Sequence, residues 1–319
     1  MADVAGPEVA ELYRSFARLE AHGRSAAYEA LGEEVAADGV ITGFVAGLPP
    51  DKHQPQLLFA AARYLLGRPP DLAGLRELVG QSGPELAAVM LARRTQTNEP
   101  ARCANLLPAL ARLPEPLALI EVGASAGLTL LFDRYSYDYA GHRLAGLDPD
   151  GPTLRCQPRG PVPLPDRIPA IAWRAGLDLN PLDVTREEDA RWLSCLVWPG
   201  ESDRAERLAA AIASARRDPP AVHRGDLVID VAALAATAPA DATLVVFHSS
   251  VLYQVDPQQR ERFASVVRDL GAVWLSGEAP GVVPGTDGPA CDGMSYVVAR
   301  DGRPVALADS HGGWLQWLR

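Results

Sequence analysis

The hydrophobic pattern of the 319-residue chain changes its period at Leu113-Pro114-Glu115-Pro116, and this change constrains the fold more than any other feature. Before it, apolar residues recur every three or four positions, as they do on one face of an α-helix. After it, short apolar runs of strand length alternate with amphipathic stretches of helix length. The two patterns predict an all-helical domain at residues 1–115, a lid or substrate domain, followed by an α/β domain at residues 116–319.

Apolar runs in the second domain have the length of buried parallel strands and are separated by amphipathic, helix-like stretches. The runs are residues 117–123, 171–179, 222–230, 242–250 and 272–278. Strand and helix in alternation predict a parallel sheet with helices on both faces. Two further β-rich runs, 295–300 and 303–309, flank the turn Asp301-Gly302, so the sheet is expected to end in an antiparallel pair.

Composition excludes several classes of function. A net charge of −10 argues against binding to nucleic acid phosphates. Lys52 is the only lysine and no Gly-Lys-Ser/Thr triplet occurs, which excludes a P-loop. The cysteines Cys103, Cys156, Cys195 and Cys291 are too far apart for a zinc ribbon or a redox pair. The chain starts without a signal-like segment and has no long uncharged apolar run, so we expect a cytoplasmic protein without contact to a membrane.

The segment EVGASAG (residues 121–127) is placed where the first predicted strand turns into a predicted helix. Two glycines four residues apart allow a sharp turn and the close approach of a ligand to the backbone. Their spacing differs from G-x-G-x-x-G, which disfavours an NAD site. The same residues read G-x-S-x-G, so a serine hydrolase that uses Ser125 as its nucleophile is an alternative. Only helices are predicted before residue 117, which argues against that alternative.

Several segments of the second domain resemble, in order, the motifs of class I S-adenosylmethionine (SAM)-dependent methyltransferases. Residues 121–127 are similar to the first motif, GLDLNP (176–181) to the second and Gly225-Asp226-Leu227 to the third. LVVFHSSVL (244–252) looks like the fourth strand and its loop, and the terminal hairpin fits the antiparallel seventh strand. The resemblance implies a seven-stranded Rossmann-like sheet with an antiparallel last strand, and SAM as the cofactor.

The resemblance also implies which residues bind the cofactor. Glu121 would supply charge near the ammonium group, and Asp178 would accept both ribose hydroxyls. Asp226 would accept the exocyclic amine of the adenine. The full set is Glu121, Gly123, Ala124, Gly127, Asp178, Leu179, Asp226 and Leu227.

Asp178 lies further from the glycine turn than the usual spacing of about 20 residues. We interpret residues 135–169, between the two motifs, as an insertion with a hairpin at the rim of the site. Asp148 is better spaced but stands in the turn signal LDPDGP, so it remains the second candidate for the ribose ligand.

Methyl transfer is an in-line displacement in which proximity and orientation provide most of the catalysis. His248 follows the fourth predicted strand and has a pKa suited to a general base, although a structural histidine is the alternative interpretation. Tyr253, on the same loop, is the second catalytic candidate. Asn98 and Glu99 precede the first strand and either reach over the cofactor or brace a loop.

Almost the whole chain also resembles a bacterial family defined only as a domain of unknown function. The similarity is found in TNEPARC (97–103), WRAGLDLNPLDV (173–184), LVWP (196–199) and His248-Ser249. It implies a fold and a cofactor but no substrate. We therefore expect a SAM-dependent methyltransferase that acts on a small molecule and uses no metal. SAM binding without methyl transfer is an alternative, and the oligomeric state stays open.

Overall fold

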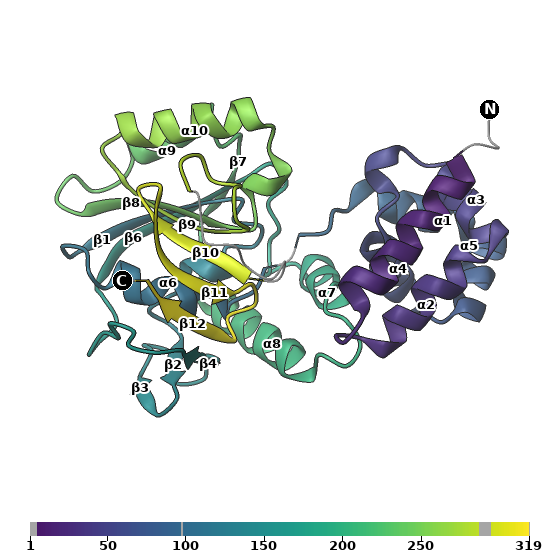
Figure 1. Ribbon diagram of the computed structural model, residues 1–319, viewed down its shortest axis with the longest axis horizontal. Coiled ribbons are helices and arrows are strands. Elements are labelled where there is room, and N and C mark those ends of the chain that lie inside the picture. Colours follow the sequence, from purple (N-terminus) through teal and green to yellow (C-terminus); the bar gives the residue numbers. More distant parts are fainter. Residues whose placement is uncertain (1–4, 97, 287–294, 319) are drawn as a thin grey trace. The chain divides into compact units, whose positions relative to one another are not determined.

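The computed structural model describes residues 5–96, 98–286 and 295–318, which form two compact units (Figure 1). The helical unit contains the described residues of Met1–Thr97 together with Arg186–Glu206. The sheet unit contains those of Asn98–Thr185 and Arg207–Arg319. Thr97 of the TNEPARC segment and Cys291 lie outside the described residues.

The helical unit confirms the helical period of the N-terminal sequence. Its helices begin at good capping residues: the side chain of Ser25 accepts a hydrogen bond at the start of α2, and those of Asp38 and Asp71 do so at the starts of α3 and α5. The elements are α1 (Ala5–Phe16), the π-helix η1 (Ala17–Ala21), α2 (Ala26–Ala36), α3 (Gly39–Ala46), the 3₁₀-helix η2 (Pro50–Lys52), α4 (Pro55–Leu66), α5 (Leu72–Ala92) and α7 (Glu187–Cys195).

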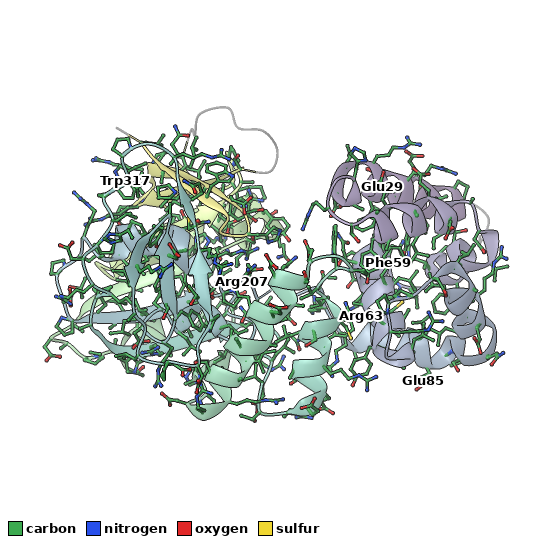
Figure 2. The ribbon with its side chains drawn as sticks, turned by 90° about the horizontal axis from the view of Figure 1, so that it is seen from below. Glu29, Phe59, Arg63, Glu85, Arg207 and Trp317 are labelled. Carbon is green, nitrogen blue, oxygen red and sulfur yellow. The ribbon has the colours of Figure 1, made fainter. Side chains whose placement is uncertain are left out.

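Aromatic side chains form the centre of the helical unit. The ring of Phe59 on α4 lies 6.0 Å from that of Tyr13, 5.8 Å from Phe16 and 4.9 Å from Tyr28, measured between centroids. One turn further along α4, Arg63 donates a hydrogen bond to the carbonyl of Val197 (Figure 2). The segment 186–206 is therefore tied to the helices that precede it by 90 residues or more along the chain.

The described part of the sheet unit contains a nine-stranded mixed sheet in the order β5-β12-β11-β10-β9-β8-β1-β6-β7. From β7 to β9 all neighbours are parallel, whereas β9 to β12 are paired antiparallel. The bounds are β1 (Leu117–Val122), β5 (Gln157–Pro158), β6 (Ile171–Asp178), β7 (Val222–Arg224), β8 (Thr243–Ser249), β9 (Val273–Glu278), β10 (Ser295–Arg300), β11 (Arg303–Asp309) and β12 (Trp314–Trp317).

A strand forms in each of the five predicted parallel runs, although in the run 222–230 only the first three residues are a strand. The turn Asp301-Gly302 joins an antiparallel pair as expected. The predicted total of seven strands is not confirmed, because β12 and the two-residue β5 extend the sheet beyond β11. An edge strand exposes a row of unpaired backbone groups. The residues after Asp309 turn back and cover that edge of β11, and a short piece of the insertion then pairs with β12.

The prediction of a helix directly after β1 is wrong, because a single 3₁₀ turn, η3 (Leu128–Leu130), forms there instead. Residues 128–132 are all buried and offer no polar face for an amphipathic helix. Farther on, every second residue from Tyr135 to Tyr139 is a buried tyrosine, which is the period of a strand. The insertion accordingly forms a second sheet of β2 (Ser136–Tyr139), β3 (His142–Leu144) and β4 (Thr153–Arg155).

Helices cover both faces of the large sheet. Figure 1 shows α9 (Val231–Ala235) and α10 (Pro257–Asp269) along one face and α6 (Arg102–Leu110) along the other. The apolar core under α10 includes Ile120, Val122 and Val246, and it also holds Phe263 of that helix. Since side chains alternate along a strand, Glu121 of β1 points to the opposite face. The remaining helix, α8 (Ser202–Arg217), leads into β7.

We predict that Phe59→Ala lowers the free energy of unfolding by about 3–5 kcal/mol, because it leaves a cavity among three aromatic rings. Leu19→Ala, at a side chain that is 76% exposed in the same unit, should change it by less than about 0.5 kcal/mol. Urea unfolding followed by far-UV circular dichroism measures both. Similar losses in the two variants would contradict the aromatic core described here.

Candidate functional site

The loop from Gly123 to Gly127 leaves the central strand β1 in an unusual backbone conformation. Gly123, Ser125 and Gly127 have φ angles of 68°, 53° and 69°, in the left-handed region that side chains disfavour. A Cβ at position 123 would lie 2.4 Å from Cγ2 of Val251, so the loop after β8 lies directly against the Gly123 backbone. Both the φ angle and this close approach require glycine at position 123.

Two polar side chains hold this glycine loop in place. The Asp178 carboxylate, at the end of β6, accepts hydrogen bonds from the backbone N–H of Ser125 and of Asn180, each at 2.7 Å. On the other side, the Asn98 amide donates to the carbonyl of Ala124 at 3.2 Å and accepts from Leu128 N–H at 2.8 Å. Asn98 thus braces the loop, and Asp178 joins the carboxyl ends of β1 and β6.

Two serines with left-handed backbones stand at the carboxyl ends of neighbouring strands, Ser125 after β1 and Ser250 (φ 58°) after β8. The other described non-glycine residues with positive φ, Ala140 and Asp301, belong to the β2–β3 and β10–β11 turns. Strain of this kind costs about 1–3 kcal/mol per residue and clusters where ligands bind. Ser125 and Ser250 do not lie in hairpin turns, so a turn does not explain their positive φ angles.

Glu121 is buried beneath the glycine loop and is 3% exposed. Its Oε1 accepts a hydrogen bond from the Thr129 hydroxyl, whereas Oε2 has no hydrogen-bond partner among the described residues. Burial raises the pKa of Glu121 to about 8, although the Thr129 hydrogen bond acts in the opposite direction. The carboxyl group is therefore largely protonated at neutral pH, which does not match the negative charge expected there.

The third predicted acidic residue, Asp226, follows β7 and shapes the next loop. Its Oδ1 accepts from the N–H groups of Val228 at 2.8 Å and Ile229 at 3.2 Å, while its Oδ2 has no hydrogen bond to a described residue. Leu227 beside it is half-buried and packs against the core under α10. One carboxylate oxygen of Asp226 is therefore engaged in the turn.

Large apolar side chains are exposed at this edge of the sheet, next to the polar residues. Leu179 follows β6 and is 65% exposed, Ile229 lies in the loop after β7 at 76%, and Tyr253 lies in η4 (Leu252–Gln254), after β8, at 56%. Apolar surface in water is unfavourable unless something covers it. All three follow the carboxyl ends of parallel strands, the edge at which ligands of open α/β sheets bind.

His248 lies inside the core and is 0% exposed. Its Nδ1 is 2.8 Å from Oε1 of Glu278, and its Nε2 accepts a hydrogen bond from the Trp274 indole at 3.0 Å. Both ring nitrogens are thus engaged, with the proton on Nδ1, so the ring has no position for a substrate proton. Glu278 Oε1 also accepts from Val251 N–H and Leu252 N–H, so this pair positions the loop that covers Gly123.

Asp148, the second candidate for the ribose ligand, belongs to a different cluster. It is buried and accepts hydrogen bonds from Ser214 and Arg217 of α8 and from the backbone of Asp150. The Ser214 hydrogen bond is the main cause that holds the pKa of Asp148 below its ordinary value, with Arg217 contributing. These contacts give Asp148 a structural role between the insertion and α8.

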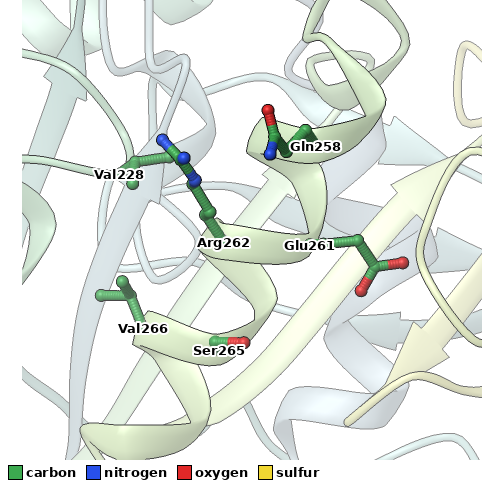
Figure 3. A pocket seen from close by; sticks show the side chains of 6 residues that line it. All are labelled: Val228, Gln258, Glu261, Arg262, Ser265 and Val266. Atoms are coloured by element: carbon green, nitrogen blue, oxygen red, sulfur yellow. The ribbon is translucent and has the colours of Figure 1, made fainter.

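A shallow groove runs beside the loop after β7 and was not predicted from the sequence. Figure 3 shows Val228 on one side and residues of α10 on the other, among them Arg262 and Glu261, which bring one charge of each sign. Within the described residues, no group of three or more His, Cys, Asp or Glu side chains is placed to hold a metal ion. No described helix is long and apolar enough to cross a membrane.

Comparison with known proteins shows the family of this chain. Residues 10–317 match a family described as an uncharacterized protein conserved in bacteria, DUF2332. The chain belongs to this family. No curated protein and no solved structure matches the chain. The matched residues span nearly the whole of both units. The description of the family names no reaction, and a fold alone does not imply one.

We predict that Gly123→Ala lowers the free energy of unfolding by about 2–4 kcal/mol, because the new methyl group meets Val251 at a left-handed φ. Gly271→Ala is the matched control, since Gly271 has a φ of 63° and no atom within 4 Å of the added Cβ. It should cost only about 1–2 kcal/mol. Equal costs in urea unfolding would mean that the contact with Val251 is not constraining.

We predict that the free energy of unfolding depends on pH through Glu121. Because the folded-state pKa of Glu121 is about 8 against an ordinary 4.5, the folded protein binds more protons than the unfolded chain between these values. This contribution is fully present below pH 4.5 and is lost as the pH rises through 8, by roughly 3–5 kcal/mol. Glu121→Gln should remove this part of the pH dependence in urea unfolding. A variant with the wild-type pH profile would contradict the assignment.

Proposed function

We propose that this protein binds SAM at the carboxyl edge of β1, β6 and β7 and transfers its methyl group to a small-molecule acceptor. The observation that carries the proposal is the placement of Asp178. Its carboxylate is half-buried at the end of β6, holds the glycine loop after β1, and is followed directly by the exposed Leu179. A carboxylate, a close-approach backbone and an apolar surface are what an adenosine with an amino-acid tail requires.

The order of the parallel strands supports the location. From β1 the chain adds β6 and β7 on one side of the sheet and later β8 and β9 on the other. The point at which the order reverses lies between β1 and β8, and ligands of open α/β sheets bind outside the carboxyl ends of the strands at this point. The strands that carry the four motifs of the methyltransferase resemblance lie side by side in the order β7-β6-β1-β8. That resemblance extends less well to the far half of the sheet.

The residues present fit the adenosine half of the cofactor. A carboxylate oxygen accepts two hydrogen bonds, so an Asp178 oxygen that already binds a backbone N–H can also accept a ribose hydroxyl. Leu179 and Ile229 offer apolar contact to a flat base, and Asp226 Oδ2 is able to accept from an exocyclic amine. For the amino-acid half the fit is different from the expected one, since the buried Glu121 is largely uncharged near pH 7.

When bound, SAM supplies a methyl group on a positively charged sulfur, and the protein's part is to hold this group in line with the acceptor. Val251 and the glycine loop exclude water from the backbone between them. His248 is not assigned the role of base, because both its ring nitrogens are engaged. Tyr253 remains the candidate for contact with the acceptor, since its side chain is exposed beyond β8. The net charge of −10 favours a small acceptor over a nucleic acid.

The hydrolase is not proposed. Ser125 has the backbone φ that a nucleophile elbow would use, but its buried Oγ has no hydrogen-bond partner among the described residues. A serine nucleophile needs a base within hydrogen-bond reach. SAM binding without methyl transfer differs from the proposed function only in turnover, so the experiment has to separate the two.

We predict micromolar binding of SAM and of S-adenosylhomocysteine in calorimetric titrations of the wild-type protein. Asp178→Asn should weaken both by about tenfold or more, through the lost charge-assisted hydrogen bonds. Leu179→Ser should weaken both by about three- to tenfold, through lost apolar contact.

The matched control is Leu147→Ser, a change at another leucine of the sheet unit that is 74% exposed, and it should leave both affinities unchanged. Absence of binding to the wild type at millimolar ligand would overturn the proposal. Binding without release of S-adenosylhomocysteine in the presence of pooled bacterial metabolites would favour the non-catalytic alternative.

A further inference from the structure

Arg102, at the start of α6, is buried without a countercharge among the described residues. It is 7% exposed, and the removal of a guanidinium from water costs several kcal/mol unless a carboxylate compensates for it. Its hydrogen bonds go to neutral groups, from Nε to the carbonyl of Ser310 at 3.0 Å and from Nη1 to that of Ser249 at 3.2 Å. It forms no ion pair with any described residue.

Four other arginines with little exposure to water do have a countercharge. Their side chains are 11–21% exposed and each pairs with a carboxylate, although these residues are less buried than Arg102. The pairs are Arg93 with Asp189, Arg174 with Asp133, Arg204 with Glu201 and Arg207 with Glu99. Arg102 is more buried than any of these four, yet it has no carboxylate partner among the described residues.

The surroundings of Arg102 belong to the edge at which the proposed site lies. Ser249, whose carbonyl it binds, ends β8 and precedes the left-handed Ser250. Ser250 in turn shares a hydrogen bond with the hydroxyl of Tyr296 on β10, and the Tyr296 ring centre is 5.9 Å from the Arg102 guanidinium. Ser249, Ser250, Tyr296 and Ser310 are all half-buried, so the guanidinium lies just beneath a polar surface.

Glu121, which interacts electrostatically with Arg102, does not compensate for this charge. Arg102 lowers the pKa of Glu121, but burial outweighs it and the pKa remains near 8. A protonated Glu121 gives Arg102 no countercharge. Two of the five N–H groups of the guanidinium are used by the carbonyls, and its Nη2 donates to no described residue.

We infer that Arg102 binds a carboxylate of a small molecule held at this site. The two terminal nitrogens of a guanidinium form a planar fork that matches a carboxylate in geometry and charge. The inference rests on the proposed function and adds the chemistry of a ligand group to it. The carboxylate belongs either to the amino-acid tail of the cofactor or to the methyl acceptor, and the two sources are distinguished by experiment.

The test compares wild type with Arg102→Gln, which removes the charge, and Arg102→Lys, which keeps it without the fork. Arg63→Gln is the control, because Arg63 of the helical unit also donates to a backbone carbonyl. Calorimetry measures the affinities for S-adenosylhomocysteine and for 5′-methylthioadenosine, which has the same nucleoside but no carboxylate. Thermal denaturation measures stabilisation by succinate and benzoate, with succinamide and benzamide as neutral counterparts.

If the carboxylate is that of the cofactor, Arg102→Gln weakens the binding of S-adenosylhomocysteine about tenfold or more and leaves the affinity for methylthioadenosine unchanged. Arg102→Lys then has an intermediate affinity for S-adenosylhomocysteine. If it is that of the acceptor, both nucleosides bind normally but stabilisation by succinate or benzoate is lost. Should Arg102→Gln not fold, Arg102→Lys decides by the same comparisons.

The inference is overturned if a folded variant weakens both nucleosides equally, or if it changes neither nucleoside binding nor the response to carboxylates. A wild type that binds no nucleoside refutes the SAM proposal alone, and the carboxylate comparison then decides on Arg102 by itself. A wild type that responds to neither refutes both.

Discussion

The hydrogen bonds that Asp178 accepts from Ser125 and Asn180 join the carboxyl ends of β1 and β6, and the remaining geometry of the site depends on them. They hold Ser125 in a left-handed conformation that a free loop would avoid. Because the loop is fixed in this way, the side chain of Val251 packs directly against the backbone of Gly123. Contacts thus run from β6 through β1 to the loop after β8.

Burial decides what the acidic and basic groups of this region do. Glu121 and His248 lie on opposite faces of the sheet, both withdrawn from water, and each is used within the protein. The His248–Glu278 pair positions the loop after β8, and Glu121 binds the Thr129 hydroxyl. The groups left at the surface are a half-buried carboxylate, apolar side chains and the neighbourhood of Arg102. They are suited to the binding and orientation that the proposed methyl transfer would need.

Local sequence patterns predicted the elements well. The apolar runs gave β1, β6, β8 and β9 nearly to the residue, because buried parallel strands are continuous in composition. Patterns failed where a pairing partner far along the chain decides the conformation. Strand β12 needed β11 beside it, and the tyrosines after residue 134 became a strand because a second sheet forms there.

The sequence by itself determined the N-terminal helices, the parallel α/β core, the terminal hairpin and the glycine turn with its acidic neighbours, because each follows from periodicity or from backbone freedom near in sequence. It did not show that residues 186–206 join the helical unit or that α6 belongs to the sheet unit. Only the tertiary structure decided the state of the site residues. Whether Glu121 is charged, whether His248 is accessible and whether Arg102 has a countercharge depend on groups brought together across strands. Electrostatics and solvation act through space, so the order of residues along the chain does not contain them.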